Sequence, residues 1–161
     1  MDGAKDGVIY FSMGTVIQTS EIPKEKLDAL LSAFAELPQR VIFKWEQDSM
    51  PGKPSNVKIG KYLPQQSILG NKTKFGILQM LNLECIAAHH RTKMFITHGG
   101  LLSTQEAAFN GVPLVGIPFF GDQQLNVAKS ARMGLAVSVD FMNMTKTSIL
   151  TAIKTVLENP S

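Results

Sequence analysis

Short runs of β-branched and aromatic residues recur along this chain, separated by longer segments in which apolar residues have helical spacing. Six of these runs predict strands, at 7–13, 40–45, 57–61, 93–97, 113–117 and 137–140. Strands that alternate with helices form βαβ units, and their parallel strands are buried on both faces. Crossovers between parallel strands are right-handed, so the pattern predicts one parallel sheet with helices on both sides.

Two of the intervening segments show the apolar pattern of an amphipathic helix. Their apolar residues recur three and four positions apart, at Leu27, Leu30, Leu31 and Phe34 and at Ile149, Ile153, Val156 and Leu157. The 161 residues, with 44% hydrophobic content, suffice for one sizeable core. We therefore predict an α/β fold, a Rossmann-like doubly wound parallel sheet, in a single domain that spans 1–161.

Charge and terminal sequence argue against several classes of partner. The 16 basic and 13 acidic residues give a net charge of only +3, a poor footprint for nucleic acid. Residues 1–6 lack the apolar core of a signal peptide. The apolar stretch 75–88 is shorter than the roughly 20 residues that cross a bilayer, so the chain as written is expected to be cytoplasmic. The single cysteine, Cys85, is interpreted as a small apolar residue.

Ligands of doubly wound sheets bind beyond the carboxyl ends of the strands, so the loops at 12–15, 62–65, 98–103 and 118–124 are the candidate site. Thr97-His98-Gly99-Gly100 follows a strand and leads into a helix expected to begin near Ser103. Backbone N–H groups at a helix start bind anions, and His98 could donate a hydrogen bond to a diphosphate. A tight βα connection with Ser103 as N-cap explains the same residues without a ligand.

The other loops offer groups for the rest of a nucleotide sugar. Glu106, about one turn into the helix, could accept two protons from a ribose diol, although a carboxylate there also stabilises the helix dipole. Hydroxyls of Ser12 and Thr15, with the N–H of Gly14, could contact the phosphates, to which Gly100 allows close approach. Asp122-Gln123 places a carboxylate beside an amide, a common pairing for sugar hydroxyls.

Other chemistries fit the sequence less well. A nicotinamide cofactor would need a G-x-G-x-x-G turn after the first strand, where this chain reads FSMGT. His89, His90 and His98 lack the partners and spacing of a metal site, so no metal and no cofactor are expected. The spacing supports neither a Ser-His-Asp nor a Cys-His arrangement, and no catalytic residue is assigned to this chain.

Taken together, FITHGGLLSTQEAAFNGVPLVGIPFFGDQQ, at 95–124, resembles the donor-binding signature of the family 1 UDP-glycosyltransferases. The similarity extends to GVIYFSMGT, KYLPQQSIL and the closing VSVDFMNMTKTSILTAIKTVLENPS, and the wording HGGLLSTQE resembles arthropod members. The resemblance implies the C-terminal, UDP-sugar-binding half of a GT-B fold. It also implies inverting sugar transfer from a donor such as UDP-glucose or UDP-glucuronate.

The resemblance also implies roles for individual residues. Tyr62 would stack on uracil, Gln65 would contact the nucleoside and Glu106 would bind the ribose hydroxyls. The diphosphate would face Ser12, Thr15, His98 and Ser103. Asp122 and Gln123 would hold the sugar. Two positions depart from the family pattern: Tyr62 is commonly Trp, and Leu102 replaces an Asn that contacts phosphate in many vertebrate members.

Parts that the family resemblance implies are missing from this sequence. The catalytic His with its Asp belongs to an N-terminal acceptor domain, and full-length animal members carry a signal peptide and an anchor in the endoplasmic reticulum membrane. We therefore expect a UDP-glycosyltransferase by family whose isolated chain supplies donor binding and is inactive. The alternative is a non-catalytic nucleotide-sugar-binding fragment or splice product that pairs, as a homo- or hetero-oligomer, with full-length enzymes. An NAD-dependent oxidoreductase is a third reading.

One segment departs from the family pattern altogether. Relatives run from a motif like LPQQSIL almost directly into AH-x-R/K-T-K, whereas here 70–87 intervenes as an atypical insertion. A lineage-specific loop would explain it, but ILQMLNLECIAA lacks the polar face of a surface loop. A retained intron is the competing hypothesis, because codons at Gly70-Asn71 and Ile86-Ala87-Ala88 can encode splice signals. Genomic DNA without those signals would exclude an intron.

Overall fold

The computed structural model describes residues 5–15, 17–61, 63 and 92–158, and these form one six-stranded parallel sheet. The strands are β1 (Val8–Ser12), β2 (Arg40–Lys44), β3 (Val57–Gly60), β4 (Thr92–Thr97), β5 (Leu114–Gly116) and β6 (Ala136–Ser138). Their order across the sheet is β3-β2-β1-β4-β5-β6, and every neighbouring pair is parallel. The prediction of six strands in a doubly wound sheet is confirmed, with strand ends shifted by one or two residues.

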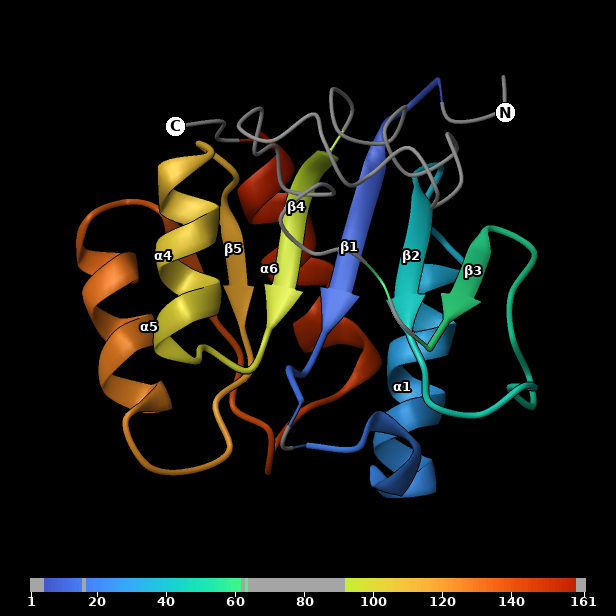
Figure 1. The fold of residues 1–161 in the computed structure, drawn as a ribbon. Coiled ribbons are helices and arrows are strands. Elements are labelled where there is room, and N and C mark those ends of the chain that lie inside the picture. The colour runs from blue at the N-terminus through green and yellow to red at the C-terminus, as the bar shows by residue number, and fades with distance from the viewer. Residues whose placement is uncertain (1–4, 16, 62, 64–91, 159–161) are drawn as a thin grey trace, which may run out of the picture.

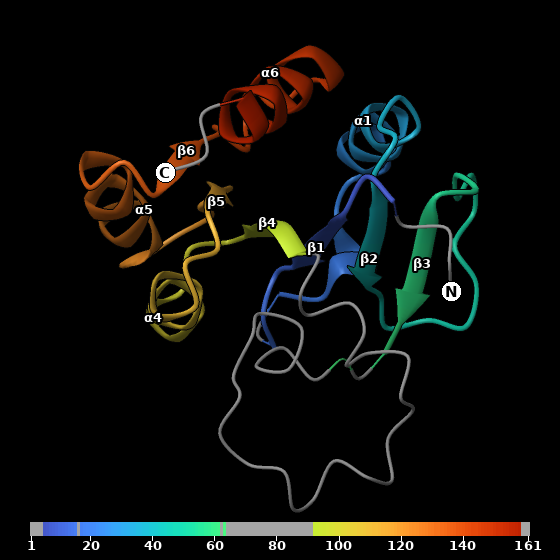
Figure 2. The same cartoon turned by 90° about the horizontal axis from the view of Figure 1, so that it is seen from above.

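Helices lie on both faces of this sheet (Figures 1 and 2). On one face α1 (Lys24–Phe34) and α6 (Lys146–Glu158) pack side by side. On the other face α4 (Leu101–Phe109) lies near β4 and β5, with α5 (Gln123–Arg132) beside it and against β6. A 3-10 turn (Thr19–Glu21) precedes α1. No helix in the described ranges is long and apolar enough to span a membrane.

The larger core lies between the sheet and the α1–α6 layer. Phe11 of β1 stacks on Phe43 of β2 with ring centroids 4.1 Å apart, and Phe34 of α1 meets both rings edge-on. The predicted apolar faces of both helices are buried here, including Leu30 and Ile153, which are fully inaccessible. These faces fix α1 and α6 on the sheet because burying apolar side chains is the main favourable term in folding.

The opposite face has a smaller core under α4. Tyr10 of β1 and Phe95 of β4 stack with centroids 4.9 Å apart, and Ala107, Val112 and Leu114 pack with them. Side chains of β1 alternate between the two faces, and all five of its residues are buried. β1 is therefore one of the two central strands of the sheet and is covered on both faces.

One asparagine fastens the connections around β2 and β3. Asn56 Nδ2 lies 2.8 Å from the carbonyl oxygen of Phe34, and 3.1 Å from those of Leu37 and Gln39. The segment before β3 therefore caps the end of α1 and the turn that follows it. The sequence indicates only an ordinary solvated turn at 47–56, and the structure adds this structural role for its last residue.

All strands end at one edge of the sheet, the lower edge in Figure 1. The chain runs from β1 outward to β2 and β3, and from β4 outward in the other direction to β5 and β6. The boundary between β1 and β4, which we call the seam, is thus the topological switch point of the sheet. In open α/β sheets this is where ligands bind.

Candidate functional site

His98 stands at the carboxyl end of the seam. Ser12, the last residue of β1, is in register with Thr97, the last residue of β4, so the two following loops meet. A Cβ placed on Gly14 would lie 2.7 Å from His98 Cε1, and one on Gly100 would lie 2.5 Å from His98 Nε2. Only glycine at both positions leaves room for the imidazole, which is therefore held between the two loops.

The environment of His98 favours its neutral form. Burial lowers the pKa of His98 below its ordinary value of 6.5; nearby Asp122 opposes this shift and Lys44 adds to it. The Nδ1 atom lies 3.3 Å from Thr97 Oγ1. A neutral imidazole has one N–H donor and one acceptor nitrogen. His98 can therefore donate a hydrogen bond to a bound anion without carrying a full charge.

The loop after β1 is shaped by hydrogen bonds at Gly14. Its N–H donates to Ser12 Oγ at 3.3 Å, and its carbonyl oxygen accepts a hydrogen bond from Lys44 Nζ at the end of β2. Gly14 has φ +79°, a conformation that favours glycine. Ser12 is buried, whereas Thr15 is exposed at the tip of the loop. Thr15, which follows the glycine that lies against His98, is therefore open to solvent.

Helix α4 begins directly behind His98. Gly100 is its N-cap, with φ −61° and ψ 147°, and Leu101 is its first residue. The helix begins two residues before Ser103, close to its expected start, but the interpretation of Ser103 as N-cap is wrong, because Ser103 is already in the first turn and is buried. The first N–H groups of a helix have no partner within it and attract anions. Glu106 lies further along α4 and is partly exposed.

Asp122 and Gln123 occupy the start of α5. Asp122 is the N-cap and is exposed, whereas Gln123 is only 5% exposed. Gln123 Oε1 accepts hydrogen bonds from the N–H groups of Phe119 at 2.8 Å and Phe120 at 3.2 Å. The carbonyl oxygen of this amide is thus used within the loop. What Gln123 can offer a ligand is its NH₂ group, a donor only.

The loop after β4 is packed against α5. A Cβ on Gly99, whose φ is +83°, would lie 2.3 Å from Val127 Cγ2. Asn126, the residue of α5 next to Val127, bonds to the same loop: its Nδ2 donates to Gly99 O at 3.2 Å and to Asp122 Oδ2 at 2.8 Å. The candidate residues after β1, β4 and β5 are thereby joined in one continuous structure at the end of the sheet.

This arrangement can be compared with known proteins. The family model described as UDP-glucoronosyl and UDP-glucosyl transferase matches residues 2–161. The chain belongs to this family. The family resemblance found in the sequence is therefore confirmed.

Insect and mammalian members of the family are similar to this chain. UDP-glycosyltransferase UGT5 of Dactylopius coccus is 38% identical over 96% of the chain, and UDP-glucosyltransferase 2 of the same insect is 39% identical over all of it. UDP-glucuronosyltransferase 2C1 of Oryctolagus cuniculus is 36% identical over 97%. The chain spans only 26–28% of the length of these relatives.

Solved glycosyltransferase structures share the fold. The glycotransferase of kitacinnamycin superposes with a TM-score of 0.75 at 22% identity, over 98% of this chain and 36% of that one. The UDP-glucose: anthocyanidin 3-O-glucosyltransferase in complex with UDP gives a TM-score of 0.73 at 22% identity, over 95% and 32%. The α/β fold of the chain therefore corresponds to about a third of a GT-B glycosyltransferase.

Some of the family residues expected in the site cannot be placed. Tyr62, Gln65 and the atypical insertion at 70–87 lie outside the described residues. Conversely, sequence reasoning missed Lys44 and Asn126, which the structure places against Gly14 and Asp122. A signal existed for each: Lys44 ends the strand beside β1, and Asn126 is one helical turn after Asp122.

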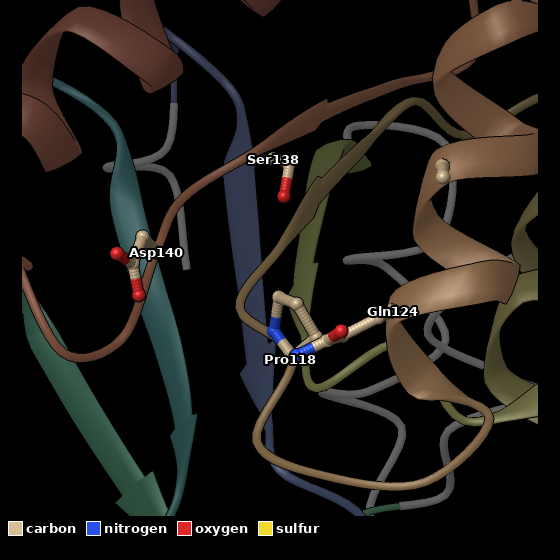
Figure 3. A pocket seen from close by; sticks show the side chains of 5 residues that line it. Pro118, Gln124, Ser138 and Asp140 are labelled. Atoms are coloured by element: carbon tan, nitrogen blue, oxygen red, sulfur yellow. The ribbon is translucent and has the colours of Figure 1, made fainter.

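A shallow pocket of about 260 Å³ borders the site on the β6 side. Figure 3 shows its lining, which comes from the loop after β5, from α5 and from the end of β6. The lining residues are Pro118, Gln124, Ala128, Ser138 and Asp140. Across the described ranges, no three His, Cys, Asp or Glu side chains gather into a metal-binding group.

Proposed function

We propose that this chain binds a UDP-sugar at the carboxyl end of the seam between β1 and β4. The observation that carries the proposal is the His98 ring held between Gly14 and Gly100, directly before the start of α4. This places an imidazole donor, two glycine-containing loops and the first turn of α4 next to one another. A diphosphate has the charge and the acceptor oxygens that such a point favours.

We assign the remaining groups to the parts of the donor as follows. The diphosphate lies against His98, Gly100 and Ser103 from one loop, and against Ser12, Gly14 and Thr15 from the other. Glu106 binds the ribose hydroxyls, while Tyr62 stacks on uracil and Gln65 contacts the nucleoside. Asp122 accepts protons from the sugar hydroxyls, and Gln123 donates from its NH₂ group because its oxygen is already bonded.

We assign a uridine nucleotide, and not NAD, to this site. Among the structures that share the fold, the anthocyanidin 3-O-glucosyltransferase and the Os79 protein of O. sativa are both complexes with UDP. Because these structures are only 22–23% identical to the chain, they support the fold alone. The proposal of UDP as the ligand rests on family membership and on the loops described above. An NAD site would require a different first loop than FSMGT.

We propose further that transfer requires more protein than these 161 residues. The reaction is transfer of a hexosyl group from UDP-glucose or UDP-glucuronate to a small lipophilic acceptor, with the acceptor and the catalytic base held by an N-terminal domain. The chain covers 26–28% of its relatives, which favours donor binding as its own share. The isolated chain then binds donor without turnover, alone or in an oligomer with full-length enzymes.

Calorimetric titration of the purified chain with UDP, UDP-glucose, UDP-glucuronate and NAD tests this proposal. We expect saturable binding of the uridine nucleotides and none of NAD. Glu106→Ala should weaken UDP binding by about tenfold to a hundredfold through loss of the ribose contact, since a hydrogen bond to a charged group contributes about 1.5–3 kcal/mol. Glu25→Ala, an exposed carboxylate in the first turn of α1, is the matched control. The proposal is refuted if this chain and the shorter form described next are both folded and neither binds a uridine nucleotide.

A second form of the protein tests whether the insertion at 70–87 affects UDP binding. A variant that lacks residues 70–87 restores the spacing of the family between LPQQSIL and the strand that leads to His98. If only this shorter form binds UDP, the insertion prevents donor binding in the chain as written. Equal binding by both forms shows that the site tolerates it. In either case the proposal of a UDP-sugar site stands. It fails only if both forms are folded and neither binds UDP.

A further inference from the structure

Asn126 makes the connection between two groups of the proposed donor site. Its Nδ2 atom is 2.8 Å from Asp122 Oδ2 and 3.2 Å from the carbonyl oxygen of Gly99. Both partners can only accept hydrogen bonds, so the amide orientation is fixed with its NH₂ group toward them. One side chain thus uses both of its protons to hold a carboxylate of α5 against the loop that follows β4.

This bond decides what Asp122 can present to a ligand. Asp122 is exposed at the start of α5, where a free side chain would sample several rotamers. The bond from Asn126 uses one acceptor position of Oδ2, and among the described residues no hydrogen bond is made to Oδ1. Asp122 therefore offers a sugar hydroxyl an oriented carboxylate instead of a mobile one.

The same bond ties that carboxylate to the diphosphate side of the site. Gly99 follows His98 directly, and it packs so closely on Val127 that no side chain would fit. Val127 is next to Asn126 on α5, so the hydrogen bond and the close contact hold the same two segments together. Gln123 differs, because its amide is held by the N–H groups of Phe119 and Phe120 within its own loop.

We propose that Asn126 is a positioning residue that fixes the Asp122 carboxylate relative to the His98 loop, so that the sugar and the diphosphate of one donor are recognised together. The inference rests on the proposed function. Asn126 touches neither part of the donor and acts through Asp122 and Gly99. Its removal should therefore weaken recognition of the sugar selectively, and only in part, because Gln123 keeps its own support.

The test compares UDP-glucose with UDP, which lacks the sugar. We expect Asn126→Ala to reduce the affinity of the purified chain for UDP-glucose about tenfold, equivalent to about 1.4 kcal/mol, while UDP changes less than about twofold. Asn126→Asp keeps the size of the side chain but cannot donate, so it should show the same selective loss. Asn143→Ala is the matched control, because Asn143 Nδ2 also donates to a carboxylate, Asp140 Oδ2, at 2.6 Å.

A double-mutant cycle then tests whether Asn126 acts through Asp122. Adding Asn126→Ala to Asp122→Ala should cost UDP-glucose no further affinity, because the positioned group is already gone. Equal losses for UDP and UDP-glucose, or fully additive effects of the two substitutions, overturn the inference while leaving donor binding intact. If neither the folded parent chain nor the folded form without 70–87 binds either nucleotide, the proposed function fails first and the inference with it. Thermal unfolding followed by circular dichroism confirms that each variant is folded.

Discussion

Replacing Gly99 by alanine tests the contact that joins the His98 loop to α5. The backbone of Gly99 has φ +83°, and a Cβ there would lie 2.3 Å from Val127 Cγ2 and 3.1 Å from the carbonyl oxygen of Gln123. Two separate costs follow. A left-handed conformation costs a non-glycine residue about 1–2 kcal/mol. Forcing a methyl group into a packed contact costs about 1–3 kcal/mol more.

The expected loss for Gly99→Ala is therefore about 2–5 kcal/mol of unfolding free energy. For a chain of this size each kcal/mol lowers the melting temperature by about 2–4 °C, so the variant should melt roughly 4–20 °C lower. Urea unfolding monitored by circular dichroism measures the free energy directly. The denaturant slope should stay unchanged if the folded state keeps its compactness.

Two further variants separate the two costs. Gly134→Ala has a similar φ of +75° with nothing within 4 Å of the added Cβ, so it should show the backbone cost alone. In a Val127→Ala background, the cost of Gly99→Ala should fall toward that of Gly134→Ala, because the closest obstructing methyl group is gone. If Gly99→Ala and Gly134→Ala lose the same free energy in the parent chain, the close packing of the loop on α5 is refuted.

Two more predictions concern other supports of the fold. Burial lowers the pKa of His98 below 6.5, so at acidic pH the unfolded chain binds more protons than the folded chain. Acidification from pH 7.5 to 5.5 should therefore destabilise the parent chain more than the His98→Asn variant. Equal pH dependence of the two melting temperatures contradicts this. Asn56→Ala leaves three carbonyl oxygens without their shared donor and should lower the free energy of unfolding in urea by about 1–3 kcal/mol. Ser55→Ala, at an exposed neighbour, should leave it unchanged. A loss for Asn56→Ala no larger than that for Ser55→Ala contradicts the capping role.

Most of the fold could be predicted from the hydrophobic periodicity of the sequence. The runs of β-branched residues predicted all six strands because strands buried on both faces have continuous apolar sequences. The spacing of Leu27 to Phe34 likewise predicted α1, since its apolar stripe is what packs on the sheet. The parallel arrangement then placed the candidate loops on one edge without any knowledge of side-chain positions.

The details of the site depended on information that the sequence does not express locally. Ser103 has the chemistry of an N-cap, but the helix already begins after Gly100, whose missing side chain leaves room for the His98 ring. Lys44 and Asn126 belong to neighbouring elements and reach the site only because β2 and α5 pack beside the loops that form it. Their roles follow from tertiary packing and rotamers, which propensity and motif spacing do not determine.

The position of the seam makes the candidate site a property of two halves of the chain. Residues 8–60 form the strands on one side of it, and residues 92–158 form those on the other. Each half is continuous in sequence, whereas His98 and Gly14 meet only once the halves have joined. A donor held by both loops would act as a non-covalent cross-link between them. At a hundred times its dissociation constant, such a ligand adds about 2.7 kcal/mol against unfolding. Amide hydrogen exchange should therefore slow in β1 and β4 together.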